Sequence, residues 1–247
     1  MVSGTTSKFS ATESYAVVIP AFNEETTIAA VIQRVHQTSA AFVIVVDDAS
    51  QDHTVAEARL AGARVICLAQ RLGAWGAIQT GLRYALKNDF SVAITMDADG
   101  QHDPSFIPAL LQPIEQGQAE VTIGAAPTRV SNARRFAWRW FRVLTGLKIQ
   151  DITSGFRAYN RSAMRIMVKS TASLLDYQDV GVLLMLRNGG QRFVEVPVAM
   201  QARTNGKSRV FSSWFIVAKY MTHTSLLALA QMDRPHATQK LGRSKAR

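Results

Sequence analysis

The chain has 247 residues, of which 47% are hydrophobic, enough to bury the core of one domain or of one domain with an appendage. Its single cysteine, Cys67, excludes an intramolecular disulfide framework and a multi-cysteine zinc site. The net charge is +10, yet residues 1–120 carry 7 Lys and Arg against 13 Asp and Glu, whereas residues 121–247 carry 21 against 5. This asymmetry indicates different partners for the two halves, and the basic half suits an anionic membrane or a phosphate-bearing acceptor.

The N-terminus shows no sign of a targeting segment. Residues 1–14 lack a charged flank followed by an apolar run, so we expect a flexible tail rather than a signal peptide. No uncharged apolar stretch reaches the roughly 18 residues of a transmembrane helix. The expected compartment is therefore the cytosol.

Strand-like and helix-like segments alternate through the first half of the chain. The expected strands are residues 16–19, 42–46, 64–68, 92–96 and 121–123. The expected helices are residues 26–37, 54–61, 76–87 and 104–116. Because the strands are apolar on both faces and separated by helices, we expect an α/β fold with a mostly parallel sheet and helices on both faces.

The pattern changes beyond residue 130. Residues 132–147 are typical of an amphipathic helix rich in Arg and Trp, and residues 191–198 of a strand interrupted by Pro197. A C-terminal helical appendage is also expected, either at a membrane interface or packed on the domain. The expected division is a flexible tail at 1–14, a folded domain at 15–210, an amphipathic, interfacial helix at 211–232 and a basic tail at 233–247.

Acidic side chains follow three of the expected strands, in residues 23–25, 47–50 and 97–99. In open α/β sheets, ligands bind beyond the carboxyl ends of the strands, so all three loops should lie on one edge. Asp47 and Asp48 repel one another unless they are paired or hydrogen-bonded. One of the two is expected to bind a base or ribose and the other to cap the helix near Thr54.

Asp97 and Asp99 flank Ala98 directly after an apolar strand. Mg²⁺ prefers oxygen ligands and often takes one or two carboxylates together with substrate phosphates. Gln101 can add a carbonyl oxygen, and a metal here would neutralise a departing diphosphate. A lone Asp-x-Asp is also common in ordinary capped turns, and Asp103 is expected to be a helix N-cap.

Six strings, in this order, resemble the family 2 glycosyltransferases, whose fold is the Rossmann-like GT-A fold. They are residues 18–25 (VIPAFNEE), 45–52 (VVDDASQD), 76–85 (GAIQTGLRYA), 97–104 (DADGQHDP), 151–157 (DITSGFR) and 203–208 (RTNGKS). The last two are similar to the branch of dolichyl-phosphate mannose synthases and bacterial polyprenyl-phosphate glycosyltransferases. The resemblance covers about residues 15–210.

The resemblance implies a role for individual residues. Metal ligands for Mg²⁺ or Mn²⁺ would be Asp97, Asp99 and Gln101. The nucleotide-sugar donor would be bound by Pro20, Ala21, Asn23, Glu24, Asp48, Asp97, Ala98, Asp99, Gln101 and Arg203. The catalytic residues would be Asp151 and Arg203, and the acceptor would be bound by Arg129, Ser154, Arg157 and Lys207.

The acceptor that the resemblance implies is a lipid phosphate, which is ionised near neutral pH and needs no base to remove a proton. The sequence agrees, because basic residues cluster without an intervening acid at Arg129, Arg134, Arg135, Arg139, Arg142 and Lys148. Asp151 is the best candidate for a base or for organising the acceptor site.

The chain departs from the family pattern at several positions. Arg71 stands where the family usually has Asn, Arg129 is displaced from the expected arginine, and Asp176 and Asp179 lie where a Glu is common. Many membrane-bound relatives also continue into two transmembrane helices, which we do not expect in this sequence.

The leading hypothesis is metal-dependent, inverting transfer of a sugar from a GDP-, UDP- or dTDP-sugar to a polyprenyl phosphate at the cytosolic membrane face, by a peripheral protein. One alternative transfers the sugar to a saccharide or other hydroxyl, with Asp151 or Asp179 as base. An alternative of another class is a non-catalytic nucleotide-sugar or nucleic-acid binder, although no nucleic-acid motif is present.

Overall fold

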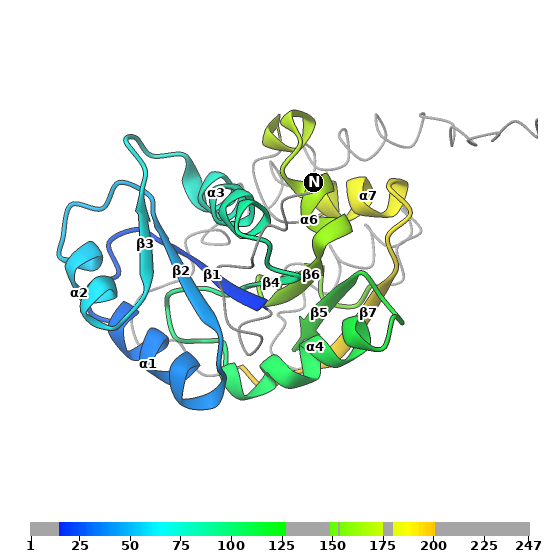
Figure 1. Cartoon of the computed structure of the whole chain (residues 1–247), viewed down its shortest axis with the longest axis horizontal. Coiled ribbons are helices and arrows are strands. Elements are labelled where there is room, and N and C mark those ends of the chain that lie inside the picture. The colour runs from blue at the N-terminus through cyan, green and yellow to red at the C-terminus, as the bar shows by residue number, and fades with distance from the viewer. Residues whose placement is uncertain (1–14, 127–148, 153, 175–179, 201–247) are drawn as a thin grey trace, which may run out of the picture.

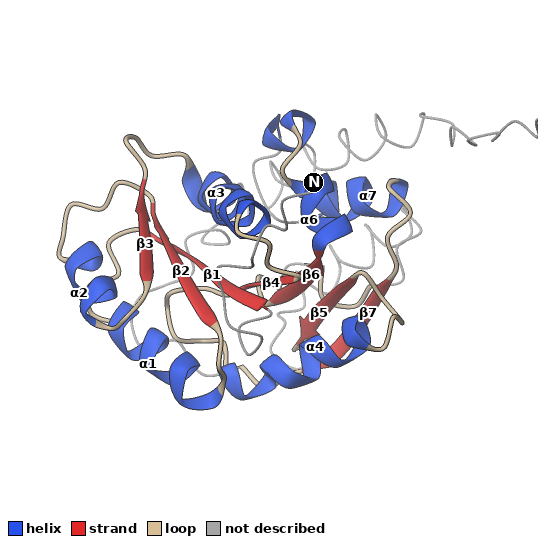
Figure 2. Cartoon of the chain, in the orientation of Figure 1, coloured by secondary structure: helices blue, strands red, loops and turns tan. Residues whose placement is uncertain are grey.

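The computed structural model describes residues 15–126, 149–152, 154–174 and 180–200. Within these residues a seven-stranded sheet lies between two layers of helices (Figures 1 and 2). The strands are β1 (Tyr15–Ala21), β2 (Phe42–Asp47), β3 (Arg64–Cys67), β4 (Val92–Thr95), β5 (Val121–Ala125), β6 (Arg157–Asn160) and β7 (Phe193–Pro197). Their order across the sheet is β3-β2-β1-β4-β6-β5-β7.

One strand reverses the otherwise parallel arrangement. β6 runs antiparallel to both of its neighbours, β4 and β5, while the other pairs are parallel. The carboxyl ends of β4 and β5 therefore lie beside the beginning of β6. This reversal returns the chain that precedes β6 to the edge where ligands are expected.

The helices divide between the two faces of the sheet. They are α1 (Ile28–Thr38), α2 (Thr54–Leu60), α3 (Gly73–Lys87), α4 (Ile107–Glu115), α6 (Arg161–Met167) and α7 (Val180–Asn188), with short 3₁₀ turns η1 (Pro104–Phe106) and η3 (Ser170–Leu174). Figure 1 shows α1, α2 and α4 on one face and α3, α6 and α7 on the other. Each face has its own apolar core, because the strands are buried on both sides.

Helix α3 lies very close to the sheet because it carries a glycine where it crosses β1. A methyl group on Gly81 would lie 2.3 Å from Val18 Cγ1 and 3.2 Å from Val46 Cγ2. Two buried side chains also join α3 to its neighbours on the same face. Trp75 Nε1 donates to Ala172 O at 2.8 Å, and Gln79 Nε2 donates to Met167 O at 2.7 Å.

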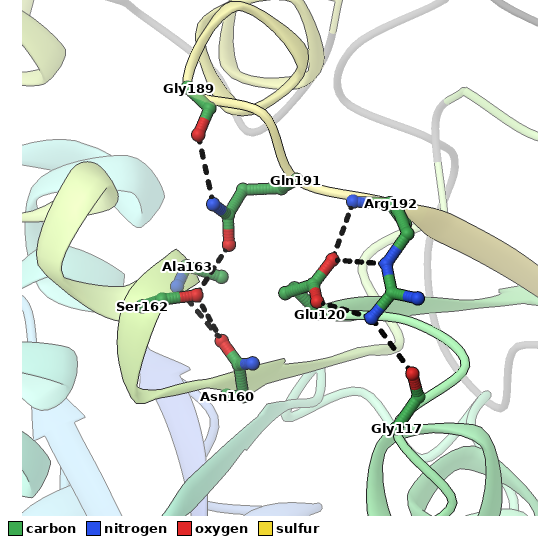
Figure 3. Close-up of polar contacts among 8 residues, drawn as sticks. All are labelled: Gly117, Glu120, Asn160, Ser162, Ala163, Gly189, Gln191 and Arg192. Carbon is green, nitrogen blue, oxygen red and sulfur yellow. Dashed lines mark hydrogen bonds and ion pairs between the residues drawn. The ribbon is translucent and has the colours of Figure 1, made fainter. Parts of the chain in front are cut away.

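The edge of the sheet opposite the carboxyl ends is held by polar contacts (Figure 3). Glu120, which precedes β5, accepts hydrogen bonds from the Arg192 guanidinium at 2.6 and 3.1 Å and from its backbone N–H at 2.8 Å. These hydrogen bonds hold the pKa of Glu120 below its ordinary value. Asn160 caps α6 by accepting from Ala163 N at 3.0 Å. The contacts fix β5, β6 and β7 relative to one another, away from the ligand edge.

The structure confirms the expected α/β fold with a mostly parallel sheet and helices on both faces. α3 begins at Gly73, before the expected start at residue 76, and Asp103 caps η1 by accepting from Ser105 N. β6, α6 and α7 were not expected from the sequence. The expected helices at 132–147 and 211–232 lie outside the described residues. None of the helices in the described part of the chain has the length and apolarity needed to span a lipid bilayer.

Candidate active site

Three acidic loops meet at the carboxyl edge of the sheet, as expected. β1 and β2 end side by side, with Ala21 opposite Asp47. β4 lies on the other side of β1, and Met96 N donates to Val18 O at 3.1 Å as the chain leaves β4. The loops that follow β1, β2 and β4 are therefore neighbours although they are far apart in the sequence.

The loops after β1 and β2 are joined to each other by side-chain to backbone hydrogen bonds. Asn23 N donates to Ser50 Oγ at 3.0 Å, and Gln51 N donates to Asn23 Oδ1 at 2.9 Å. Glu24 N donates to Thr54 Oγ1 at 2.8 Å, which extends the connection to the start of α2. We call these contacts the loop zipper. Two of the expected donor residues, Asn23 and Glu24, thus have a structural function in this edge.

Two residues of the loops after β1 and β2 have left-handed backbone conformations. Asn23 has φ of 54° and Ala49 has φ of 60°. Such values are uncommon for residues other than glycine and carry a conformational cost, which is larger for Ala than for Asn. The surrounding hydrogen bonds hold the two residues in this shape.

Asp48 is 3% exposed and connects β2 to the beginning of α3. Its Oδ1 accepts from Leu72 N at 2.6 Å and its Oδ2 from Gly73 N at 2.9 Å. Arg71 Nε lies 3.7 Å from Oδ2, and the Arg71 guanidinium carbon lies 3.8 Å from the centre of the Phe22 ring. The carboxylate therefore binds the N-terminus of α3, where the helix dipole favours negative charge.

The expectation that Asp47 or Asp48 caps the helix near Thr54 was wrong. Asp47 Oδ2 accepts from Ser50 N at 3.2 Å within its own loop. The N–H of Thr54 instead donates to Asp52 Oδ1 at 3.0 Å. Burial raises the pKa of Asp52, but hydrogen bonds from Thr54 and from the Glu25 N–H outweigh it, so the pKa lies below its ordinary value.

The loop after β4 carries the three expected metal ligands, Asp97, Asp99 and Gln101. Asp97 and Asp99 are partly exposed, and Ala98 between them is buried in the core. Asp99 Oδ1 accepts from Gln101 N at 3.1 Å, which fixes the main chain of the turn through Gly100.

Gly155 closes one side of the Asp97 carboxylate. A methyl group at this position would lie 3.0 Å from Asp97 Oδ1 and 3.2 Å from Oδ2. Thr95 Oγ1 donates to Gly155 O at 2.7 Å, so the loop before β6 is fixed to the end of β4. A side chain at this position would force the Asp97 carboxylate to shift by a few tenths of an ångström.

The described residues contain no group of three or more His, Cys, Asp or Glu side chains able to hold a metal ion by themselves. The expected ligands, two carboxylates and one amide oxygen, would form only part of the coordination shell of a metal ion. That set fits Mg²⁺ or Mn²⁺, which complete their coordination with water and substrate phosphates, and does not fit a permanently enclosed structural zinc.

The expected acceptor residues lie in and beside the loop that precedes β6. Asp151 is 5% exposed, its Oδ2 accepts from Ala126 N at 3.3 Å, and its backbone N–H donates to Glu195 Oε1 at 2.8 Å. Ser154 is buried, and its Oγ accepts from Phe156 N at 3.2 Å. These contacts place Asp151 at the end of β5, on the same edge as Asp97.

Arg157 does not lie on an accessible surface. Its side chain is 0% exposed, and Nη2 donates to Ile152 O at 2.8 Å. Direct contact with an acceptor, as the sequence predicted, does not fit this burial. Through its hydrogen bond to Ile152 O, Arg157 instead holds the loop that carries Asp151. Arg129, Arg203 and Lys207 lie outside the described residues.

Sequence reasoning missed three residues of this edge. His102 accepts a hydrogen bond from Asp97 N, Gly155 contacts the Asp97 carboxylate, and Glu195 holds the Asp151 loop. The first two stand inside strings that carry the family resemblance, which was an available signal. Glu195 gave none, because its partners lie 44 and 45 residues earlier in the chain.

Comparisons with known proteins identify the family of the chain. The sequence profile described as "Glycosyl transferase family 2" matches residues 16–170, which is more than half of the chain. The chain is a family 2 glycosyltransferase. The matched residues include the three acidic loops, α3 and the Asp151 loop.

Curated relatives of this glycosyltransferase include enzymes named for lipid-linked sugars. It is 30% identical over 220 residues to the polyprenol monophosphomannose synthase of Mycolicibacterium smegmatis, covering 82% of this chain and 83% of that protein. It is also 30% identical over 212 residues to the undecaprenyl-phosphate mannosyltransferase of Micrococcus luteus, covering 78% and 86%.

A solved structure supports the fold of the glycosyltransferase. Glucosyl-3-phosphoglycerate synthase from Mycobacterium tuberculosis, crystallised with Mn²⁺, uridine-diphosphate-glucose and phosphoglyceric acid, has a TM-score of 0.69. It is 21% identical, and the match covers 91% of this chain and 82% of that one. This likeness confirms the GT-A fold expected from the sequence.

Proposed function

We propose that this glycosyltransferase moves a sugar from a nucleoside-diphosphate sugar to a polyprenyl phosphate, with inversion at the sugar carbon and with Mg²⁺ or Mn²⁺ at the loop after β4. The names of the relatives support the acceptor, because one is named for polyprenol monophosphomannose and the other for undecaprenyl phosphate. The basic second half of the chain, with 21 Lys and Arg against 5 Asp and Glu, suits such an anionic lipid at the cytosolic membrane surface.

The donor side is supported by the loops after β1, β2 and β4. Asp97, Asp99 and Gln101 would hold the cation, which supplies charge neutralisation for the departing diphosphate when it is bound. The loop zipper would keep Asn23 and Glu24 beside the nucleoside. Ala21 and Ala98 have buried side chains, so any contact they make with the donor would come from their backbone.

The acceptor side is supported by the Asp151 loop. A lipid phosphate arrives ionised, so the reaction needs orientation and desolvation of a nucleophile more than removal of a proton. Asp151 is buried and accepts a backbone hydrogen bond, which suits an organising carboxylate. Arg129, Ser154 and Lys207 remain expected acceptor ligands, and Arg203 an expected ligand of the donor diphosphate.

The observation that carries the proposal is the Asp97–Asp99 loop held against Gly155, in a chain similar to polyprenyl-phosphate enzymes. The test incubates the purified chain with detergent-dispersed polyprenyl phosphate, Mn²⁺ or Mg²⁺, and radiolabelled GDP-, UDP- or dTDP-sugars. We expect label in the lipid fraction, abolished by chelation and by Asp99→Ala, with the urea-unfolding midpoint retained. Label only in hydroxyl acceptors would refute the lipid phosphate. Undiminished transfer by Asp99→Ala would refute the metal assignment.

A further inference from the structure

The imidazole of His102 is buried next to the proposed metal ligands. It is 1% exposed and stacks on the Phe156 ring, with centroids 5.1 Å apart and planes inclined by 19°. A buried polar ring has a desolvation cost unless its two nitrogens have partners. The contacts of those two nitrogens therefore indicate why the ring is there.

The two nitrogens of His102 face the same residue, Asp97. Nδ1 accepts a hydrogen bond from Asp97 N at 3.0 Å, which leaves the ring proton on Nε2. Nε2 lies 3.7 Å from Asp97 Oδ2, beyond hydrogen-bond distance, and has no partner among the described residues. One nitrogen thus fixes the main chain of Asp97, and the other lies 3.7 Å from its carboxylate.

The Asp97 carboxylate lies between this imidazole and Gly155. Gly155 leaves room for the carboxylate on one side, where an added methyl group would lie 3.0 Å from Oδ1. The carboxylate is still 49% exposed, so it is accessible to a cation from the open edge. The backbone of His102 also pairs with Met200, which immediately precedes the segment that contains Arg203.

We propose that His102 is the positioning residue of the metal loop. Nδ1 holds the Asp97 backbone, and Nε2, now 3.7 Å from Oδ2, donates to the Asp97 carboxylate when that carboxylate binds the divalent cation. This inference rests on the proposed function, because it assumes that Asp97 binds the cation. It adds a residue that touches neither substrate nor metal and that acts through Asp97.

Two amide substitutions separate the two nitrogens. His102→Asn places an acceptor near the position of Nδ1 and removes the Nε2 donor, whereas His102→Gln places an amide near the position of Nε2. The measurement is the dissociation constant of Mn²⁺, from the electron paramagnetic resonance signal of the free ion. It is made on the full chain with UDP, GDP or dTDP present, alongside urea unfolding without metal. His36→Asn, which alters an exposed histidine, controls for adventitious binding.

We expect His102→Asn to weaken Mn²⁺ binding about 10–100-fold, the usual range for a group that orients a metal ligand. His102→Gln should bind Mn²⁺ with most of the affinity of the unsubstituted chain. This order of affinities should hold whether His102→Gln or His102→Asn is the less stable variant in urea. Equal Mn²⁺ affinities of the two variants, or affinities that follow stability, would overturn the inference. Asp97→Asn distinguishes failure of this inference from failure of the proposed function. Unchanged Mn²⁺ binding by that variant would refute the proposed metal site itself.

Discussion

Asp48→Asn should destabilise the protein strongly, because both carboxylate oxygens accept backbone hydrogen bonds at the start of α3. An asparagine retains one acceptor and turns an NH₂ group toward the second N–H. The side chain of Asp48 is only 4% exposed, so water cannot replace the lost partner. Hydrogen bonds to charged groups contribute about 1.5–3 kcal/mol, and an unpaired buried N–H costs about 1–3 kcal/mol.

We therefore expect Asp48→Asn to lower the free energy of unfolding by about 2–4 kcal/mol, and the melting temperature by on the order of 10 °C. Urea unfolding followed by circular dichroism measures the change. Asp89→Asn is the matched control, because Asp89 is 63% exposed and pairs with Arg161 at the surface, so its effect should stay within about 0.5 kcal/mol.

The same variant tests which role Asp48 has. If the carboxylate mainly holds α3, stability and nucleotide binding should fall together, and both should recover at lower temperature. Unchanged stability with lost binding of UDP, GDP and dTDP would refute the structural reasoning, and would return Asp48 to the role of a direct nucleoside ligand.

Three further substitutions test the fold. Ala49→Gly should raise the free energy of unfolding by about 0.5–1 kcal/mol, because it relieves the φ of 60°; a loss in urea unfolding would contradict the strain. Gly81→Ala should cost about 1–3 kcal/mol through the clash with Val18, and Val18→Ala in the same chain should make the two changes non-additive in a double-mutant cycle. Glu120→Gln should destabilise the protein at neutral pH and lose its effect in acid. Because folding lowers the Glu120 pKa, its contribution is present above the ordinary value of 4.5 and disappears as the pH falls through the lower folded value. A pH-independent difference in melting temperature would contradict the ion pair.

The layered fold could be predicted from the sequence because each early strand is a run of apolar residues between amphipathic helices. β6 could not, because it is four residues long and begins with Arg157, a charged residue that pattern reasoning places on a surface. Its burial depends on neighbours from β4 and β5, which the local sequence does not identify.

The candidate site divides in the same way. The Asp103 cap was predictable because its partner, Ser105 N, lies two residues away. The partners of Asp48 lie 24 and 25 residues further along, and Gly155 reaches Asp97 only through the reversed strand. Contacts between residues this far apart in the sequence depend on strand order, which follows from the packing of the whole sheet.

The loop zipper has a consequence for the thermodynamics of donor binding. A nucleotide that bound between two disordered loops would lose affinity to the entropy of ordering them. Here the loops after β1 and β2 are already joined through Asn23, Ser50 and Thr54. Donor association should therefore be rapid, with a small heat-capacity change, and should leave the backbone of this half nearly unmoved.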